Sequence, residues 1–366
     1  ELMSTRKITG EIKMKNYYYK KVVTSSLVLG LTVSALFAGA IKSQGSAGAA
    51  QLLIPSGSKN LALGNANVSL ATGVNAMHVN PSGTSGMSSG GQVLVSDMTY
   101  IADIGVSYAG LVSKLGNIGT VGLAVKSLDF GDIPVTTATE TEGTGATYSP
   151  SFLTMTANYS RAYADNVRFG VNLKFVSETI MSTSANGIAG DLGVQYDFST
   201  LPVSVGVALK NLGGRMTYSG SDMEQTMAPA GSQSGSLVER FRVQAQSFEL
   251  PAQLDIGINY KPINGLEVLA AFTNNSASTN VTSLAAKFSM SNFWVGGGMS
   301  MNSVIGDQGD YTSGQWGDIT DSPFGASFGA GVSFPVGELN LDLSYSMRSV
   351  SNYFDNNSLI EMAVNF

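Results

Sequence analysis

Residue types suited to acid–base chemistry are scarce in this chain, which contains one histidine and no cysteine. The single histidine, His78, lies shortly before Ser82, so the pair could supply a general base and a nucleophile. A hydrolytic triad also needs a third group that orients the base, and all three groups must converge in space. No such third residue is indicated, so we interpret His78 as a hydrogen-bonded structural residue. We therefore expect neither enzymatic activity nor a cofactor.

A second candidate for chemistry is the segment 306–321, which is rich in glycine and aspartate. Calcium binds several such carboxylate oxygens, but the spacing differs from that of an EF-hand loop. We predict a solvated surface loop, with a calcium site as the alternative, and expect no dedicated metal centre. The aspartates concerned are Asp307, Asp310, Asp318 and Asp321.

Two segments carry side chains suited to contact with a partner protein. Tyr311 and Trp316 lie in the acidic segment, and exposed aromatic residues often anchor interfaces. The segment 212–249 places methionines among polar residues, and exposed methionine accommodates varied partners. Alternatively, these methionines only pack their loop against the rest of the protein. The methionines are Met216, Met223 and Met227.

The elements that must position these residues are strands, and the segment 339–348 is the clearest example. Its odd positions are apolar and its even positions are polar. A strand turns successive side chains to opposite faces, so this segment has one apolar face and one polar face. It could cover a soluble core, or it could face lipid on one side and a polar lumen on the other. Its length also matches the roughly 9–11 residues that a tilted strand needs to cross a bilayer.

The same alternation recurs along the chain and predicts about fourteen strands. Short connections alternate with connections that include long ones at 129–149, 212–249 and 302–324. Short turns on one rim and long loops on the other are typical of an outer-membrane barrel, whereas a soluble sandwich need not sort its loops. We therefore predict an all-β fold, a transmembrane antiparallel β-barrel. The strands are expected at 91–99, 104–112, 118–128, 150–162, 166–179, 187–198, 202–211, 250–261, 265–274, 280–289, 292–301, 325–334, 338–348 and 357–366.

Composition agrees with a barrel. Only 13% of the residues are charged, against about 25% in ordinary soluble proteins. No stretch after the N-terminal region is long and apolar enough for a membrane helix. The net charge of −6 argues against a nucleic-acid partner.

Several charged residues fall on the polar faces of the predicted strands, where they would point into the lumen. They could line a polar permeation path, or they could pair with one another around a plug. A barrel of about fourteen strands is too wide for side chains alone to fill, so we favour pairing around a plug. The residues are Arg168, Lys174, Asp191, Asp255, Asp342 and Arg348, and Glu361 lies on the same face.

The region before the strands divides into three parts. Residues 14–40 have the basic region, the apolar region and the Ala-x-Ala site of a secretory signal peptide. Residues 1–13 precede Met14, and we interpret them as an upstream leader or a misassigned start. Residues 41–90 are rich in small residues and suit a plug, or hatch, inside a barrel formed by residues 91–366. The expected plug residues are Leu61, Leu63, Gly64, Met77, His78, Asn80 and Pro81.

A motif in this plug region reads Gly…Ala-Leu-Gly-x-Ala…Ala…Asn-Pro-x-Gly. Similar pieces follow at 207–214 and 250–262. In this order the motifs resemble the PorV/PorQ family, whose members are outer-membrane barrels of the FadL-like superfamily. The matching positions are Gly57, Leu61, Leu63, Gly64, Ala66, Ala71, Ala76, Asn80, Pro81 and Gly83.

This resemblance implies an outer-membrane protein of a Gram-negative bacterium. The even strand count predicts that both termini lie on the short-turn, periplasmic side. It implies a role in type IX protein secretion, in which the loops would receive cargo proteins beside the secretion translocon. The wider FadL-like group implies an alternative, a channel for the uptake or export of hydrophobic small molecules. Phe366 resembles the terminal aromatic residue that barrel-assembly machinery recognises. Outer-membrane lipid and that machinery are therefore further expected partners.

Overall fold

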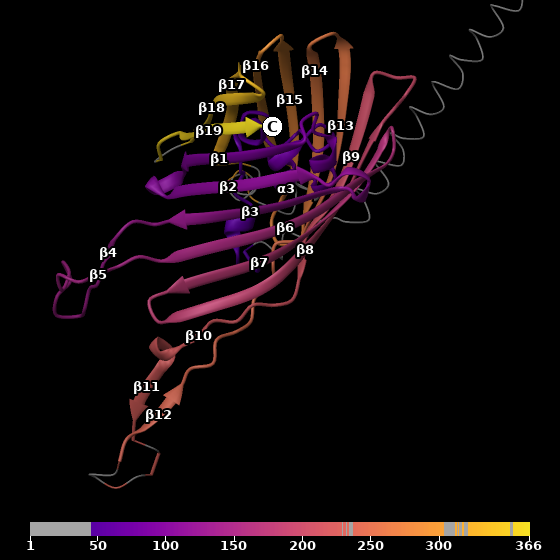
Figure 1. Cartoon of the computed structure of the whole chain (residues 1–366). Coiled ribbons are helices and arrows are strands. Elements are labelled where there is room, and N and C mark those ends of the chain that lie inside the picture. Colours follow the sequence, from indigo (N-terminus) through magenta and orange to yellow (C-terminus); the bar gives the residue numbers. More distant parts are fainter. Residues whose placement is uncertain are drawn as a thin grey trace, which may run out of the picture. The chain divides into compact units, whose positions relative to one another are not determined.

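A closed antiparallel barrel forms the framework of the protein (Figure 1). The structure is a computed structural model and describes residues 45–228, 230–231, 233, 237–303, 312, 314, 317, 321–351 and 354–366. Within this part of the chain, each barrel strand pairs with its neighbours in sequence. The strands are β1 (Gly91–Thr99), β2 (Gly105–Lys114), β3 (Thr120–Asp129), β6 (Ser151–Ala164), β7 (Val167–Ile180), β8 (Thr183–Asp197), β9 (Val203–Gly213), β13 (Gln253–Ile263), β14 (Leu266–Asn275), β15 (Asn280–Met290), β16 (Phe293–Ser303), β17 (Phe324–Val336), β18 (Leu339–Val350) and β19 (Asn357–Asn365).

The strand pairings show how many strands form the barrel and how it closes. The sheet holds 15 strands, of which β10 (Ser219–Gly220) is a short addition beside β8, so 15 − 1 = 14 strands form the wall. The first and last strands pair directly, with Gln92 opposite Asn365 and Thr99 opposite Ser358. These pairings confirm the predicted fold class. Most boundaries differ from the predicted ones by one to three residues. The largest difference is at β8, which begins at Thr183 rather than at 187, in a polar stretch without the alternation that signals a strand.

Burial is inverted relative to a soluble protein. On β7, the apolar residues Phe169 and Leu173 are 48% and 61% exposed, whereas the polar residues Asn172 and Lys174 are 4% and 5% exposed. An apolar exterior around a polar interior is the arrangement of a barrel in lipid. The barrel therefore presents its hydrophobic residues to the membrane.

The described residues include no helix that is long and apolar enough to span a membrane.

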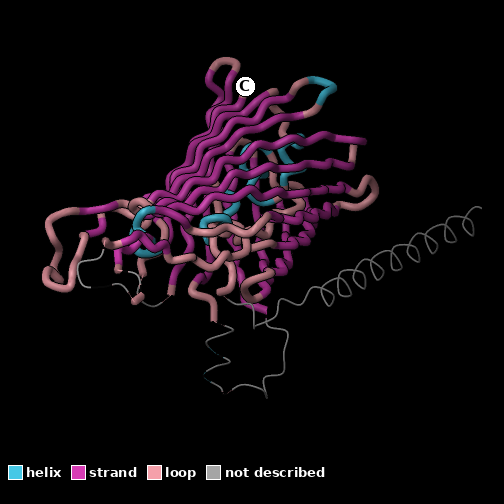
Figure 2. Tube along the Cα trace, turned by 90° about the horizontal axis from the view of Figure 1, so that it is seen from below, coloured by secondary structure: helices cyan, strands magenta, loops and turns pink. Residues whose placement is uncertain are grey.

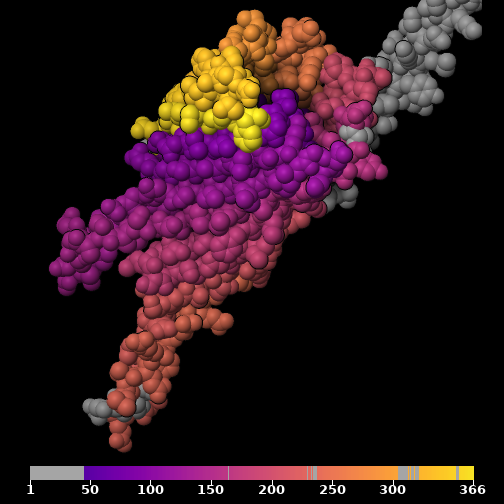
Figure 3. Space-filling model, in the orientation of Figure 1, coloured from indigo at the N-terminus to yellow at the C-terminus, as the bar shows by residue number. Residues whose placement is uncertain are grey.

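The two rims of the barrel differ in their connections. On one rim, which we call the short-turn rim, tight turns join β6 to β7, β13 to β14, β15 to β16 and β17 to β18. The opposite, long-loop rim carries the hairpin β4–β5 (Ile133–Pro134 and Thr147–Tyr148) and the hairpin β11–β12 (Glu224–Met227 and Glu239–Arg242). Figure 3 shows both hairpins extending away from the wall. This arrangement agrees with the predicted sorting of loops.

Residues 45–90, which we call the enclosed segment, run through the barrel between its rims. Their helices are η2 (Ala50–Leu52), α2 (Ser58–Ala62), η3 (Gly73–Asn75), α3 (Ala76–Val79) and η4 (Pro81–Gly86). Helix η4 contacts β6, β7 and β8, while α2 contacts β16 to β19 across the lumen. Figure 2 shows these short helices lying among the strands.

The enclosed segment enters at the long-loop rim. The N–H of Gly45 donates to the carbonyl of Ala277, and that of Gly48 donates to the carbonyl of Glu249, at 3.1 Å each. The sequence predicts both termini on the short-turn side. Phe366 lies there, but the first described residues lie at the opposite rim, because the segment traverses the lumen before β1 begins.

The predicted signal peptide, residues 14–40, and the leader, residues 1–13, lie outside the described residues. So do Tyr311, Trp316 and three of the four loop aspartates, Asp307, Asp310 and Asp318. These sequence interpretations remain predictions.

The apolar exterior generates a depth-dependent prediction on one strand. Leu343 lies in the middle of β18, and Leu339 lies at its short-turn end, with both side chains exposed. Substitution of Leu343 by Arg should cost about 2–4 kcal/mol of folding free energy in lipid, and the same change at Leu339 about 0–1 kcal/mol. Reversible unfolding in lipid vesicles measures both. Equal costs at the two positions would contradict the lipid-facing assignment.

Barrel closure generates a second prediction, at Phe366. Its N–H donates to the carbonyl of Gly91 at 3.0 Å, and the N–H of Gly91 donates back at 2.8 Å. The Phe366 ring also covers Gly91 so closely that a methyl group there would collide with it. Deletion of Phe366 should lower the amount of folded protein in the outer membrane and leave export to the periplasm unchanged. Quantification in both fractions tests this, and an undiminished outer-membrane level would contradict it.

Candidate functional site: the segment enclosed by the barrel

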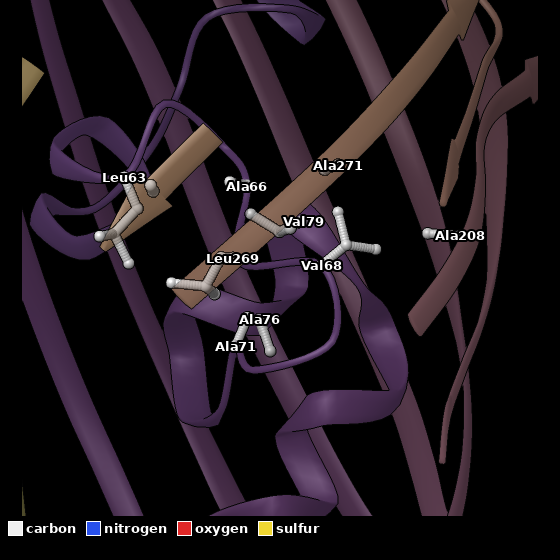
Figure 4. Close-up of a cluster of buried hydrophobic side chains, with 10 residues drawn as sticks. Leu63, Ala66, Val68, Ala71, Ala76, Val79, Ala208, Leu269 and Ala271 are labelled. Carbon is white, nitrogen blue, oxygen red and sulfur yellow. The ribbon is translucent and has the colours of Figure 1, made fainter. Parts of the chain in front are cut away.

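Apolar side chains of the enclosed segment pack against the inner wall in several clusters. In one cluster, Leu63, Val68 and Val79 meet the small residues Ala208 of β9 and Ala271 of β14 (Figure 4). The three predicted anchors, Leu61, Leu63 and Met77, are each 1% exposed or less and belong to three different clusters. The segment is therefore held on several sides of the lumen at once.

Glycines in the wall let the backbone of the segment approach closely. A methyl group added at Gly298 would lie 2.8 Å from the carbonyl carbon of Leu63, and one at Gly329 would lie 2.8 Å from the Cβ of Ala62. On the far side, Gly193 faces Asn80 and Pro81 in the same way. Strand glycines mark such approaches. Gly64, also predicted in the plug, itself faces the wall, with its carbonyl accepting from Ser300 Oγ at 3.1 Å.

Asn80 connects the turn of the segment to the wall. Its side-chain Nδ2 donates to the carbonyls of Val68 and of Val194 in β8, at 3.0 Å each. Its Oδ1 accepts from the N–H of Ser82 at 3.2 Å and from the Ser82 hydroxyl at 2.7 Å. Asn80 thus caps η4, with Pro81 at the first helical position. The Ser82 hydroxyl, considered above as a nucleophile, donates its hydrogen bond to Asn80 rather than to His78.

Polar side chains of β6, β7 and β8 form a buried network against the segment. Asn172 Nδ2 donates to the carbonyl of Met77 and to Asp191 Oδ2, at 2.7 Å each. Asn158 Nδ2 donates to Asn172 Oδ1 at 2.8 Å and to the carbonyl of Pro81 at 3.2 Å. Lys174 Nζ lies 2.7 Å from Asp191 Oδ2, so the acid is shared between a cation and an amide. This network satisfies segment carbonyls that no water would reach.

The predicted lumen-facing charges are largely paired. Besides Lys174 and Asp191, Asp255 pairs with Lys210 at 2.7 Å, and both side chains are buried. Arg168 pairs with Asp197 at 2.8 Å in a more exposed position near the short-turn rim. A buried charge is costly without a partner, which explains the pairing. The partners Lys210 and Asp197 are absent from the residues singled out in the sequence.

Two further predicted charges, on β18, have neutral neighbours. Asp342 Oδ2 accepts from Asn365 Nδ2 at 2.8 Å. The guanidinium carbon of Arg348 lies 3.7 Å from the centre of the Phe324 ring, a cation–π contact. These side chains belong to the wall and its long-loop end rather than to the buried network.

Glu361 of β19 binds the first turn of α2. Its Oε2 accepts from the N–H of Ser58 at 2.7 Å, and its Oε1 accepts from Asn75 Nδ2 at 3.2 Å. Glu361 holds the first half of the enclosed segment, and the bond from Asn80 to Val194 of β8 holds the second half. Glu361 is therefore part of the candidate site.

His78 lies on α3 and lines a small interior cavity. Burial lowers the pKa of His78 well below its ordinary value of 6.5, and the positive charges of Lys126, Lys210 and Lys174 lower that pKa further. The imidazole is therefore neutral in the folded protein at neutral pH.

One predicted loop contact is wrong. Met216 is fully buried, packed on Gly187 with Tyr218 and Phe248 around it. Its N–H donates to the carbonyl of Phe248 at 2.9 Å, and the reverse bond has the same length, so the loop folds back onto the rim. Met223 and Met227 lie farther along the loop, and Met227 is 48% exposed on β11.

The described residues hold no group of acidic or histidine side chains that could bind a metal ion. Of the four aspartates proposed for calcium, only Asp321 is described, so the calcium alternative remains a prediction.

Comparison with known proteins gives a result at the level of fold. No family model and no curated protein matches the sequence. Among solved structures, the CymD monoaromatic hydrocarbon channel is similar with a TM-score of 0.52 at 14% identity, over 86% of this chain and 98% of that chain. A FadL homologue of Pseudomonas aeruginosa has a TM-score of 0.53 at 12% identity, over 85% and 98% of the two chains. The chain has a FadL-like barrel fold.

The Pseudomonas putida toluene transporter TodX is similar as well, with a TM-score of 0.50 at 12% identity, over 83% of this chain and 96% of that chain. The similarity therefore extends over nearly the whole length of each channel. None of these comparisons supports the PorV/PorQ family specifically, so the narrower of the two resemblances is not established.

Sequence reasoning missed the polar residues that hold the segment. Asn158, Gln195 and Lys126 all lie on inward faces, and each binds a carbonyl of the enclosed segment. Their inward position could be read from the alternation of their strands. Their partners could not, because each bond joins positions far apart in the chain.

The lowered pKa of His78 generates a pH prediction. Below about pH 6.5 the unfolded chain binds a proton at His78 that the folded protein does not, so stability should fall as the pH decreases. The fall should begin near pH 6.5 and continue as the pH decreases further. Replacement of His78 by Gln should remove that share of the loss, because the chain has no other histidine. Urea unfolding in detergent at several pH values measures the difference, and parallel profiles would contradict it.

Proposed function

We propose that this protein is a channel in the outer membrane of a Gram-negative bacterium through which hydrophobic small molecules pass. The observation that carries the proposal is a fourteen-stranded barrel, with an apolar exterior and an enclosed N-terminal segment, whose fold matches proteins described as a monoaromatic hydrocarbon channel and a toluene transporter. The match extends over more than four fifths of the chain. In this proposal the short-turn rim faces the periplasm.

The interior argues against a wide aqueous pore. Lys174 and Lys210 are each paired with an inward aspartate, and polar side chains of the wall bind the enclosed segment. A solute that crosses the barrel must therefore displace part of this segment. Selectivity for hydrophobic solutes is consistent with such a path, because ions and sugars would need a hydrated lumen.

The secretion role that the PorV/PorQ resemblance implies has less support. Met216 is buried and unavailable to cargo, and the comparisons point to channels instead. The hairpin β11–β12 still exposes Met227 and Phe241. The test below therefore includes a variant without this hairpin.

Uptake in proteoliposomes tests the channel. Toluene should enter vesicles that contain the purified protein faster than protein-free vesicles, while a sugar of similar mass should not. The N–H of Val243 donates to the carbonyl of Met223 at 2.8 Å, so these residues can be joined by a short turn after deletion of 224–242. This variant should retain uptake. Toluene uptake equal to that of protein-free vesicles would overturn the proposal.

A reversible lock on the enclosed segment gives a sharper prediction. Thr84 Oγ1 in η4 and Ser160 Oγ in β6 lie 2.5 Å apart, so cysteines at these positions can form a disulfide. The natural chain has no cysteine, so the bond would be unique. In the Thr84→Cys, Ser160→Cys variant, oxidation should abolish toluene uptake and reduction should restore it. The Ser160→Cys single variant is the control and should not respond, whereas full uptake by the locked form would show that this end of the segment does not move.

A further inference from the structure

A small cavity lies between the wall and the enclosed segment, beside β3, β6 and β7. Its volume is about 20 Å³, which exceeds the roughly 10–15 Å³ that one water molecule needs. The cavity therefore has room for a water molecule or a small ion. The lining residues are Leu52, Ser56, Met77, His78, Tyr108, Lys126, Thr154, Thr156 and Lys174.

The lining carries positive charge and no carboxylate. Lys126 is 5% exposed, and its Nζ donates to the carbonyl of Ile54 at 2.8 Å. Among the described residues it has no ion pair, whereas Lys174 and Lys210 are each paired with one aspartate. Lys126 is therefore a buried basic group that no carboxylate of the described residues pairs with. A buried cation of this kind is costly unless an anion accompanies it.

Two buried hydroxyl groups at the cavity lack a hydrogen-bond partner. Thr154 and Ser56 are 3% and 2% exposed, and neither Thr154 Oγ1 nor Ser56 Oγ is hydrogen-bonded. Thr154 lies directly opposite Lys126 in the β3–β6 pairing, so its hydroxyl and the ammonium group come from adjacent positions. Both hydroxyl groups can donate, as can the remaining N–H groups of Lys126.

We propose that this cavity binds a halide ion, chloride in the cell. The donors from Lys126, Thr154 and Ser56 would surround the ion, and its charge would neutralise Lys126. A water molecule would satisfy the hydroxyl groups but leave the lysine charge uncompensated. The ion would join β3 and β6 to the enclosed segment through Ser56, and would thereby hold that segment in place.

Bromide locates the ion directly. Protein refolded in detergent and crystallised from sodium bromide should show an anomalous peak in the cavity, near Lys126 Nζ and Thr154 Oγ1. The Lys126→Met variant, which keeps most of the length of the side chain and removes the charge, should lose the peak. Lys114→Met is the matched control, because Lys114 also donates to a carbonyl of the segment, that of Met87, but lies outside the cavity lining. This control should keep the peak.

Thermal unfolding gives an independent measurement. Wild-type protein refolded in sodium chloride should melt at a higher temperature than protein refolded in sodium gluconate at the same ionic strength, because gluconate is too large for the cavity. The difference should persist in Lys114→Met, shrink in Thr154→Val and vanish in Lys126→Met.

Equal melting temperatures in the two salts, together with no bromide peak in the wild type, would overturn the proposal and leave a water-filled cavity. If Lys126→Met fails to fold, the two wild-type measurements and the melting temperatures of Thr154→Val still test the halide site. The result does not depend on toluene uptake, so the halide site and the channel proposal can fail separately.

Discussion

The structure depends on one constraint, that the polar backbone of the enclosed segment must be satisfied inside a barrel whose exterior faces lipid. Segment carbonyls cannot rely on bulk water, and the short helices leave many of them unpaired. The wall supplies the partners. Asn80 reaches back to Val194, while Asn172, Gln195 and Lys126 reach inward to the segment. These polar side chains therefore provide the hydrogen bonds that the backbone of the segment needs inside the barrel.

The same constraint explains the small residues of the wall. A segment that hydrogen-bonds to the wall must approach it closely, and a side chain at the contact would prevent this. Gly193 and Gly298 provide the space on opposite sides of the lumen. Not every strand glycine serves this purpose, since Gly297 points away from the segment, between the inward positions Gly296 and Gly298. Because successive positions of a strand face opposite sides, only a glycine at an inward position can leave space for the segment.

These contacts bear on transport. The enclosed segment is bound by individual hydrogen bonds, ion-paired neighbours and small apolar clusters rather than by a continuous sheet. Such a segment can shift without opening the barrel wall, whose strands remain paired around the full circumference. A wall that stays paired around a separately held segment is compatible with the proposed channel for small solutes.

The period-two alternation and the order of short and long connections determined the barrel, its strand count and the inward faces from sequence alone, because the backbone geometry of a strand is local. The composition of residues 41–90 likewise indicated a segment unlike the wall. Only the tertiary structure decided which inward groups meet. Glu361 binds Ser58 across 303 positions, and Lys210 rather than another lysine pairs with Asp255. Met216 is buried because its loop folds back to Phe248. Such contacts depend on the stagger of the closed barrel and on loop paths, which no local pattern encodes.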